Sequence, residues 1–138
     1  MASRVRKVSY CKVMLTSRAG QGAKVLAALR DAGVDLLAFT GFPAGAGKAQ
    51  VDLVAESPGV IRRVAGRHGW KVSGAKKAFL IQGDDKVGAV AGVLGRLARA
   101  GINVTAVDAV AAGKRRYGMI LWVKPRDYAR AAKALGAQ

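Results

Sequence analysis

The stretch Gly83-Asp84-Asp85-Lys86-Val87-Gly88-Ala89 joins two segments with different hydrophobic patterns, and the fold follows from it. Before it, residues 78–81 form a short apolar run that is typical of a buried strand. After it, apolar residues recur every three or four positions as far as Gly101, which predicts a helix with one buried face. Asp84 and Asp85 stand where an N-cap and a first-turn acid are expected, and Gly101 stands where a helix ends.

The turn between this strand and this helix is also the candidate centre of function. The first N–H groups of a helix have no partner within the helix, and the helix dipole adds partial positive charge at the same place. A strand that turns directly onto a helix exposes these groups to the turn. An anionic group such as a carboxylate would be stabilised there.

The rest of the chain continues as strands and helices in the order β-α-β-β-α-β. Strands are predicted at residues 5–16, 34–40, 49–55 and 70–73, with helices at 23–33 and 58–67 and a turn-rich loop at 41–47. Shifting the chain by 68 residues finds the same pattern again without a gap, for example with Gly20 on Gly88 and Gly33 on Gly101. The matched glycines stand at loops and helix ends, where unusual backbone angles are needed.

We therefore expect an α+β protein in which a ferredoxin-like β-α-β-β-α-β unit occurs twice, at residues 1–74 and 75–138. Each unit should have an antiparallel sheet with helices on one face. The second copy stops at Gln138, where only the start of its last strand is expected. The open edge would pair with another chain or with the long N-terminal strand, unless the charges of Lys76 and Lys77 prevent pairing at this edge. From this edge we predict a homo-oligomer, most simply a dimer formed through sheet edges.

Composition bounds the class of protein. Apolar residues make up 51% of the chain, which is enough for a hydrophobic core, and no apolar run approaches the roughly 18 residues of a membrane span. The basic N-terminus lacks the apolar region of a signal peptide, so we expect a cytoplasmic protein without a membrane partner. Cys11 is the only cysteine and His68 the only histidine, which excludes an internal disulfide and a Cys/His metal site. We expect no cofactor.

The charge is unusual for a chain of this size. There are 24 basic residues against 8 acidic ones, a formal net charge of +16. This balance favours anionic partners, including nucleic acid. The basic residues are spread along the whole sequence instead of forming one run, so charge alone does not establish a nucleic-acid site.

Two motifs flank the first helix of each unit. Before the helix lies [Asp/Ser]-x-x-Gly, as Asp85-Lys86-Val87-Gly88 and Ser17-Arg18-Ala19-Gly20. After it lies Ala-Gly-[Ile/Val]-[Asn/Asp], as Ala100-Gly101-Ile102-Asn103 and Ala32-Gly33-Val34-Asp35. With equal spacing in both copies and coverage of nearly the whole chain, these motifs resemble tandem ACT domains. The resemblance implies regulatory modules that bind an amino acid. Because no enzyme is attached, it implies a stand-alone sensor or a small regulatory subunit of a separate enzyme.

The resemblance also implies which residues hold the ligand. In the second unit, the amides near Gly88, Ala89 and Val90, with Val87 in the same loop, would bind the carboxylate. Asp84 or Asp85 and the strand residue Asn103 would hold the ammonium group. The corresponding candidates in the first unit are Ser17, Gly20, Gln21 and Asp35. Ser17 replaces the acid there, so the second loop is the better candidate.

A nucleic-acid binder is the alternative, because the same scaffold supports RNA-recognition motifs. Residues 115–122 partly match the basic and aromatic strand of such motifs, and Phe79 would be a first-strand aromatic. Tyr117 and Trp122 lie five residues apart, however, and therefore on opposite faces of a strand. They do not form one stacking platform.

An enzyme is the third class, and we expect no catalytic activity. Asp84 and Asp85 are adjacent, so their side chains diverge instead of converging on one substrate atom. His68 has no partner that the sequence identifies. Residues 45–48, Gly-Ala-Gly-Lys, match a phosphate-binding loop only in part and lead into a strand.

Overall fold

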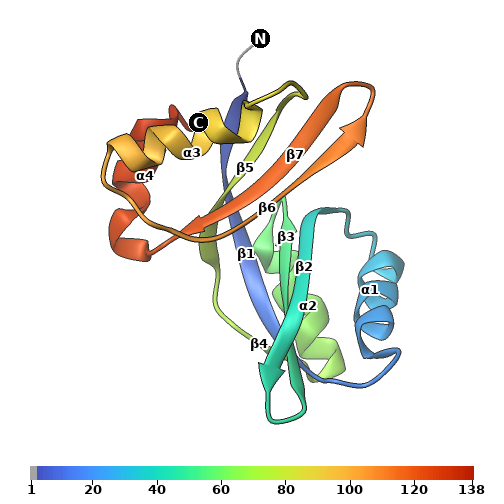
Figure 1. Cartoon of the computed structure of the whole chain (residues 1–138). Coiled ribbons are helices and arrows are strands. Elements are labelled where there is room, and N and C mark those ends of the chain that lie inside the picture. Colours follow the sequence, from blue (N-terminus) through green and yellow to red (C-terminus); the bar gives the residue numbers. More distant parts are fainter. Residues whose placement is uncertain (1–2) are drawn as a thin grey trace. The chain divides into compact units, whose positions relative to one another are not determined.

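The computed structural model describes residues 3–138, which form two compact units (Figure 1). The N-terminal unit comprises residues 9–76, and the C-terminal unit comprises residues 3–8 and 77–138. The division at residues 74 and 75 stays a prediction from the sequence. Within the described residues, no helix is both long enough and apolar enough to cross a membrane.

The N-terminal unit is a four-stranded antiparallel sheet with two helices. Its elements are β1 (Arg4–Thr16, from residue 9 on), α1 (Gln21–Asp31), β2 (Leu36–Gly45), β3 (Lys48–Ala55), α2 (Pro58–His68) and β4 (Lys71–Val72). The strand order is β4-β1-β3-β2. Alternate residues of β1 and β3, such as Cys11 and Leu53, pack with Leu29 of α1 and Ile61 of α2 in the core. Both helices therefore cover the same face of the sheet.

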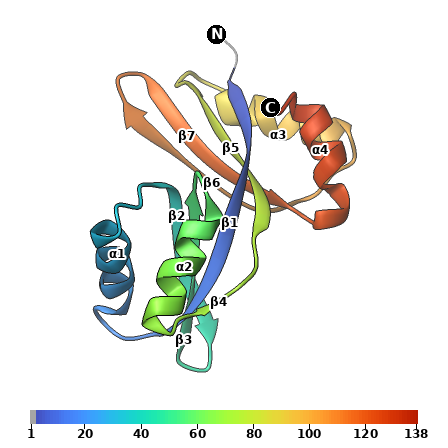
Figure 2. The same cartoon turned by 180° about the vertical axis from the view of Figure 1, so that it is seen from behind.

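The C-terminal unit has the same architecture. Its elements are the first residues of β1, then β5 (Lys76–Asp84), α3 (Ala89–Arg99), β6 (Val104–Gly113), β7 (Arg116–Val123), the 3-10 turn η1 (Pro125–Asp127) and α4 (Tyr128–Leu135). The strand order is β1-β5-β7-β6. The helices α3 and α4 lie side by side (Figures 1 and 2) and bury Leu97 and Leu135 against Phe79 and Leu121. The expected α+β class, with antiparallel strands and helices on one face, is confirmed.

The start of β1 takes the place of the strand that the second copy lacks. Val5 is 3% exposed and belongs to the core of the C-terminal unit. The backbone N–H of Lys7 donates to the Gln138 carbonyl (2.9 Å), and the N–H of Gln138 donates to the Val5 carbonyl (3.1 Å). Of the two partners expected for the open edge, the long N-terminal strand is therefore the one present. A dimer through sheet edges stays a prediction, but this edge is already occupied.

The pairing registers of the two units correspond residue by residue. Cys11 of β1 pairs with Leu53 of β3, and 68 residues later Phe79 of β5 pairs with Leu121 of β7. The irregularities near both ends of the β2–β3 pairing recur at the same places between β6 and β7. The two sheets therefore place equivalent sequence positions on equivalent faces.

The expected loop at residues 41–47 is mostly strand. Phe42 pairs with Gln50 and Pro43 with Ala49, and β2 ends only at Gly45. The glycines and the proline indicated a loop, but β2 lies at the edge of the sheet, where such residues are tolerated. The hairpin turn itself is short.

The expected start of the second-unit helix is also wrong. The helix α3 begins at Ala89 with Gly88 as its N-cap, and no acid lies in its first turn. Gly88 has a φ of 83°, in the left-handed region that favours glycine. The chain turns at Gly88, so Asp84 and Asp85 precede the helix instead of capping it.

Candidate functional site

A pocket of about 310 Å³ opens beside the N-terminus of α3 in the C-terminal unit. The turn before the helix contributes Asp85 and Lys86, and the first turn of α3 contributes residues 88–91. The opposite wall is formed by residues 109–111 of β6 and by Tyr117 of β7. The pocket thus lies where the strand-to-helix turn meets the ends of two further strands.

The N-terminus of α3 supplies unused backbone donors to this pocket. Gly88 has no side chain with which to cap the helix, and no side-chain cap is formed. The N–H of Ala89 donates to the Lys86 carbonyl (3.0 Å), and the first helical bond runs from Gly92 N–H to the Gly88 carbonyl (2.9 Å). Between them, the N–H groups of Val90 and Ala91 have no acceptor within the helix. Both residues line the pocket, so their amides and the helix dipole favour an anion there.

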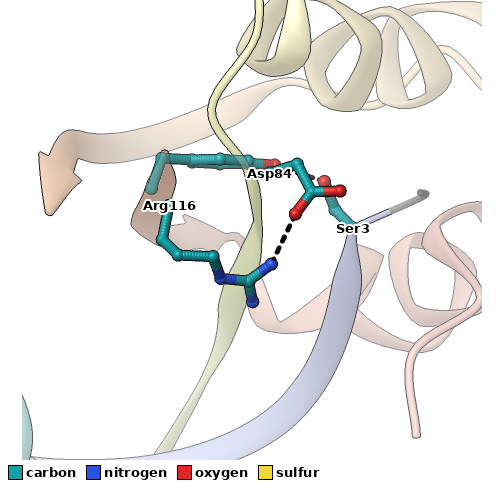
Figure 3. Close-up of polar contacts among 4 residues, drawn as sticks. Ser3, Asp84 and Arg116 are labelled. Carbon is teal, nitrogen blue, oxygen red and sulfur yellow. Dashed lines mark hydrogen bonds and ion pairs between the residues drawn. The ribbon is translucent and has the colours of Figure 1, made fainter. Parts of the chain in front are cut away.

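Asp84, the last residue of β5, is held by an ion pair. A guanidinium nitrogen of Arg116, at the start of β7, donates to Asp84 Oδ1 at 2.9 Å (Figure 3). This hydrogen bond holds the pKa of the Asp84 carboxyl below its usual value. Because both side chains are well exposed, the pair contributes little to stability. Asp84 therefore already has a cationic partner.

Asp85 has a different position from its neighbour. It is exposed, it lines the pocket, and its backbone N–H donates to the Arg115 carbonyl (2.7 Å). That bond fixes the turn against the β6–β7 hairpin. Of the two acids, Asp85 is the one that lines this pocket.

Tyr117 is part of the wall opposite α3, and it was not singled out as a ligand-site residue from the sequence. It is 4% exposed, and its hydroxyl is hydrogen-bonded to Ser3 Oγ. Tyr117 pairs across the sheet with Gly83, and a Cβ at Gly83 would lie 3.0 Å from the tyrosine ring. A glycine opposite an aromatic residue at the end of a strand is the sequence signal that would have located this wall.

The structure brings together four of the expected ligand residues, Asp85, Gly88, Ala89 and Val90. Val87 is fully exposed and does not line the pocket. Asn103 lies beyond the far end of α3, an 11-residue helix that spans about 16 Å. One amino acid in this pocket would not reach it. An ammonium contact from Asn103 would need a ligand bound elsewhere, and it stays an untested prediction.

The candidates in the N-terminal unit surround the start of α1. Gly20 is the N-cap of α1, with a φ of 88° that matches Gly88, and Gln21 is the first residue of the helix. Ser17 is exposed in the preceding turn, whereas Asp35 is exposed just before β2, at the other end of the helix. A ligand site at these residues stays a prediction.

The aromatic residues of the RNA-binding alternative are all buried. Phe79 is 0% exposed, Tyr117 4% and Trp122 7%, so none of the three presents a ring face for stacking. Among residues 3–138, no group of three or more His, Cys, Asp or Glu side chains is placed to hold a metal ion.

Solved structures share this fold. The chain aligns over 97% of its length with 88% of a protein from Bacteroides thetaiotaomicron, with a TM-score of 0.80 and 17% identity. Over 99% of its length it aligns with 95% of two regulatory subunits of aspartate kinase. The ligand-free subunit from Thermus thermophilus gives a TM-score of 0.69 at 14% identity, and the subunit from Thermus flavus gives 0.63 at 17%. These likenesses confirm the fold expected from the resemblance to ACT domains. No family model and no curated protein matches the sequence significantly.

Proposed function

We propose that this chain is a regulatory protein that binds a free amino acid in the pocket beside α3 and catalyses no reaction. The observation that carries the proposal is the combination of two unused amides and one carboxylate around the same pocket. An amino acid is a zwitterion. Its carboxylate would accept hydrogen bonds from the N–H groups of Val90 and Ala91, and its ammonium group would meet Asp85.

The size and lining of the pocket agree with such a ligand. A volume of about 310 Å³ is at the small end of the range for small-molecule pockets. Ala109, Val110 and Ala111, together with Tyr117, offer a largely apolar wall to the side chain of the ligand.

A regulatory role is supported by the fold, since two of the similar structures are regulatory subunits of aspartate kinase. We propose that the chain acts on a separate enzyme in the cytoplasm, and that it works as a homodimer assembled through sheet edges. Edge strands are available for this in β2 and β6, which each pair with only one neighbour among residues 3–138.

A thermal-shift screen of the amino acids tests the proposal. At 100 times its Kd, a ligand that binds only the folded protein adds about 2.7 kcal/mol to the free energy of unfolding, so at least one amino acid should raise the Tm clearly. Asp85→Ala should remove this shift. Asp31→Ala, which removes an exposed acid at the last residue of α1 in the N-terminal unit, should keep it. If no amino acid changes the Tm at millimolar concentration, the proposal fails.

A second variant tests the backbone donors. Val90→Pro removes one N–H group from the first turn of α3, where a proline is tolerated because that N–H has no partner in the helix. We expect the amino-acid shift to disappear while the Tm without ligand changes little. Gly22→Pro, at the matching position of α1, is the control. An unchanged shift in the Val90→Pro protein would exclude this amide as a ligand contact.

A further inference from the structure

A second pocket, of about 350 Å³, lies along the flank of α3 and is rich in basic residues. Lys86, Arg96 and Arg99 contribute three cations to its lining, and Asp84 contributes the only acid. The charge of Asp84 is offset by Arg116 at 2.9 Å. The pocket therefore carries an excess of positive charge close to three units.

Glycines on α3 leave room for a ligand between these cations. Gly88, Gly92, Arg96 and Arg99 recur along one face of the helix, and all four line the pocket. A Cβ at Gly92 would meet nothing within 4 Å, so the space above it is open. Arg99 folds back along the helix, with Nη1 3.3 Å from where a Cβ of Gly95 would lie. The guanidinium of Arg99 thus lies close to the surface of the helix, near Gly95.

Two of the three cations have no partner among the residues that the structure describes. Within residues 3–138, the side chains of Lys86 and Arg99 form no hydrogen bond and no ion pair. Arg96 is held by a hydrogen bond from Nη1 to the Leu135 carbonyl (3.0 Å), which fixes its guanidinium at the pocket. One anchored and two free cations are a suitable arrangement for a multivalent anion.

We propose that this pocket binds an anion with two or more linked phosphate groups, either free polyphosphate or the phosphate chain of a nucleotide. Arginine donates paired N–H groups to phosphate oxygens, and lysine adds a compact charge. A single carboxylate would neutralise only one of the three cations. The pocket shares Lys86, Gly88 and Ala89 with the amino-acid pocket, but it extends along α3 past Gly92, Val93, Arg96 and Arg99, which do not line the other one.

Isothermal titration of the full chain with sodium tripolyphosphate in 0.15 M salt tests the proposal. Arg99→Gln and Lys86→Gln should each weaken binding by on the order of tenfold, because each removes a charge-assisted contact. Gly92→Leu should abolish binding by filling the pocket, and it should not lower the Tm, since leucine favours a helix more than glycine does. Arg67→Gln, in the last turn of α2, makes the same charge change in the N-terminal unit and should bind as the unaltered chain does.

Several outcomes would overturn the proposal. The first is that the unaltered chain does not bind tripolyphosphate, and the second is that Gly92→Leu binds it fully. The third is an equal loss of affinity in Arg67→Gln and Arg99→Gln, which would indicate diffuse attraction to the +16 charge. Loss of tripolyphosphate binding in Asp85→Ala would also count against a separate site.

Two further ligands identify the source of the phosphates. If ATP binds as tightly as tripolyphosphate, the pocket recognises the phosphate chain alone. If ATP binds more tightly than tripolyphosphate, the ligand is a nucleotide. Both results support the proposed phosphate-binding pocket. A single-stranded oligonucleotide that binds more tightly than tripolyphosphate, and whose binding Gly92→Leu does not change, would overturn the proposal in favour of a nucleic-acid surface.

Discussion

Tyr128 makes a buried polar contact in the core of the C-terminal unit. Its hydroxyl donates to the Ala78 carbonyl at 2.9 Å, and its ring stacks on Phe79 with 4.4 Å between centroids. Burial raises the pKa of Tyr128 to about 12, from an ordinary value of 10.0. The stability of this core therefore depends on pH in the alkaline range, through the protonation of the Tyr128 hydroxyl.

We expect Tyr128→Phe to lower the free energy of unfolding by about 1 kcal/mol, because the Ala78 carbonyl loses its partner. The raised pKa means that the unfolded chain loses the Tyr128 proton first as the pH rises. The stabilising effect of the hydroxyl is thus complete below pH 10 and is lost between pH 10 and about 12. Chemical denaturation should show that the difference in free energy of unfolding between the unaltered chain and Tyr128→Phe is smaller at pH 11 than at pH 8. A gap of constant size would contradict this account.

At the scale of single residues, the sequence located the site but did not divide the roles of its acids. Asp84 and Asp85 are equivalent in any pattern of types and spacings. They differ because the register of β5 on β7 places Arg116 opposite Asp84. That register depends on packing across the whole sheet, so the roles of the two acids became clear only from the structure.

The turn of the β6–β7 hairpin places two residues with side chains at unfavourable backbone angles. Its turn residues Lys114 and Arg115 have φ values of 52° and 58°, in the left-handed region. The β2–β3 hairpin places Ala46 and Gly47 at the matching positions, with φ values of 52° and 70°. Two-residue hairpin turns of this kind favour glycine at the second position, because side chains there are strained.

Arg115→Gly should therefore raise the free energy of unfolding by about 1 kcal/mol. The Arg115 carbonyl keeps its bond from Asp85, because that contact is made by the backbone. The reverse change, Gly47→Arg, should destabilise the other hairpin by a similar amount. Urea denaturation of both variants measures this. A loss of stability in Arg115→Gly would show that its side chain contributes more than its backbone strain costs.

At the scale of elements, the sequence predicted the helices well, because each has one apolar face. It was less successful where glycine and proline are compatible with more than one kind of local structure. In residues 41–45 they lie within an edge strand, and at Gly88 a glycine moved the helix start past both acids. Local composition signals a break in regular structure, and only the neighbouring strands decide where the break falls.

At the scale of the whole molecule, the C-terminal unit depends on residues from the far end of the chain. Val5 is buried in its core, and the backbone of residues 5 and 7 is bonded to Gln138. The sequence predicted that the second copy lacks a strand and named the N-terminal strand as one of two possible partners. From that edge it predicted a dimer, because an exposed edge attracts any strand in reach and the sequence does not show which strand lies nearest.

Deletion of residues 1–8 should selectively destabilise the C-terminal unit. Loss of Val5 alone removes about 1.5–3 kcal/mol of apolar burial, and the edge of β5 becomes exposed as well. Hydrogen-exchange mass spectrometry should show faster exchange in residues 77–138 and little change in residues 9–76. Equal protection of both units after the deletion would contradict the role given to the start of β1.

The split of the C-terminal unit between the two ends of the chain has a consequence during synthesis. Residues 9–76 are contiguous, so this unit completes its sheet as soon as it leaves the ribosome. Residues 3–8 emerge before any of it, yet their partners, β5 and Gln138, are made only after residue 75. Val5 therefore stays in water until at least β5 has been made, and the backbone bonds to Gln138 form later still. A chain that ends near residue 120 would contain one finished unit and one unit that lacks the end of β7 and all of α4.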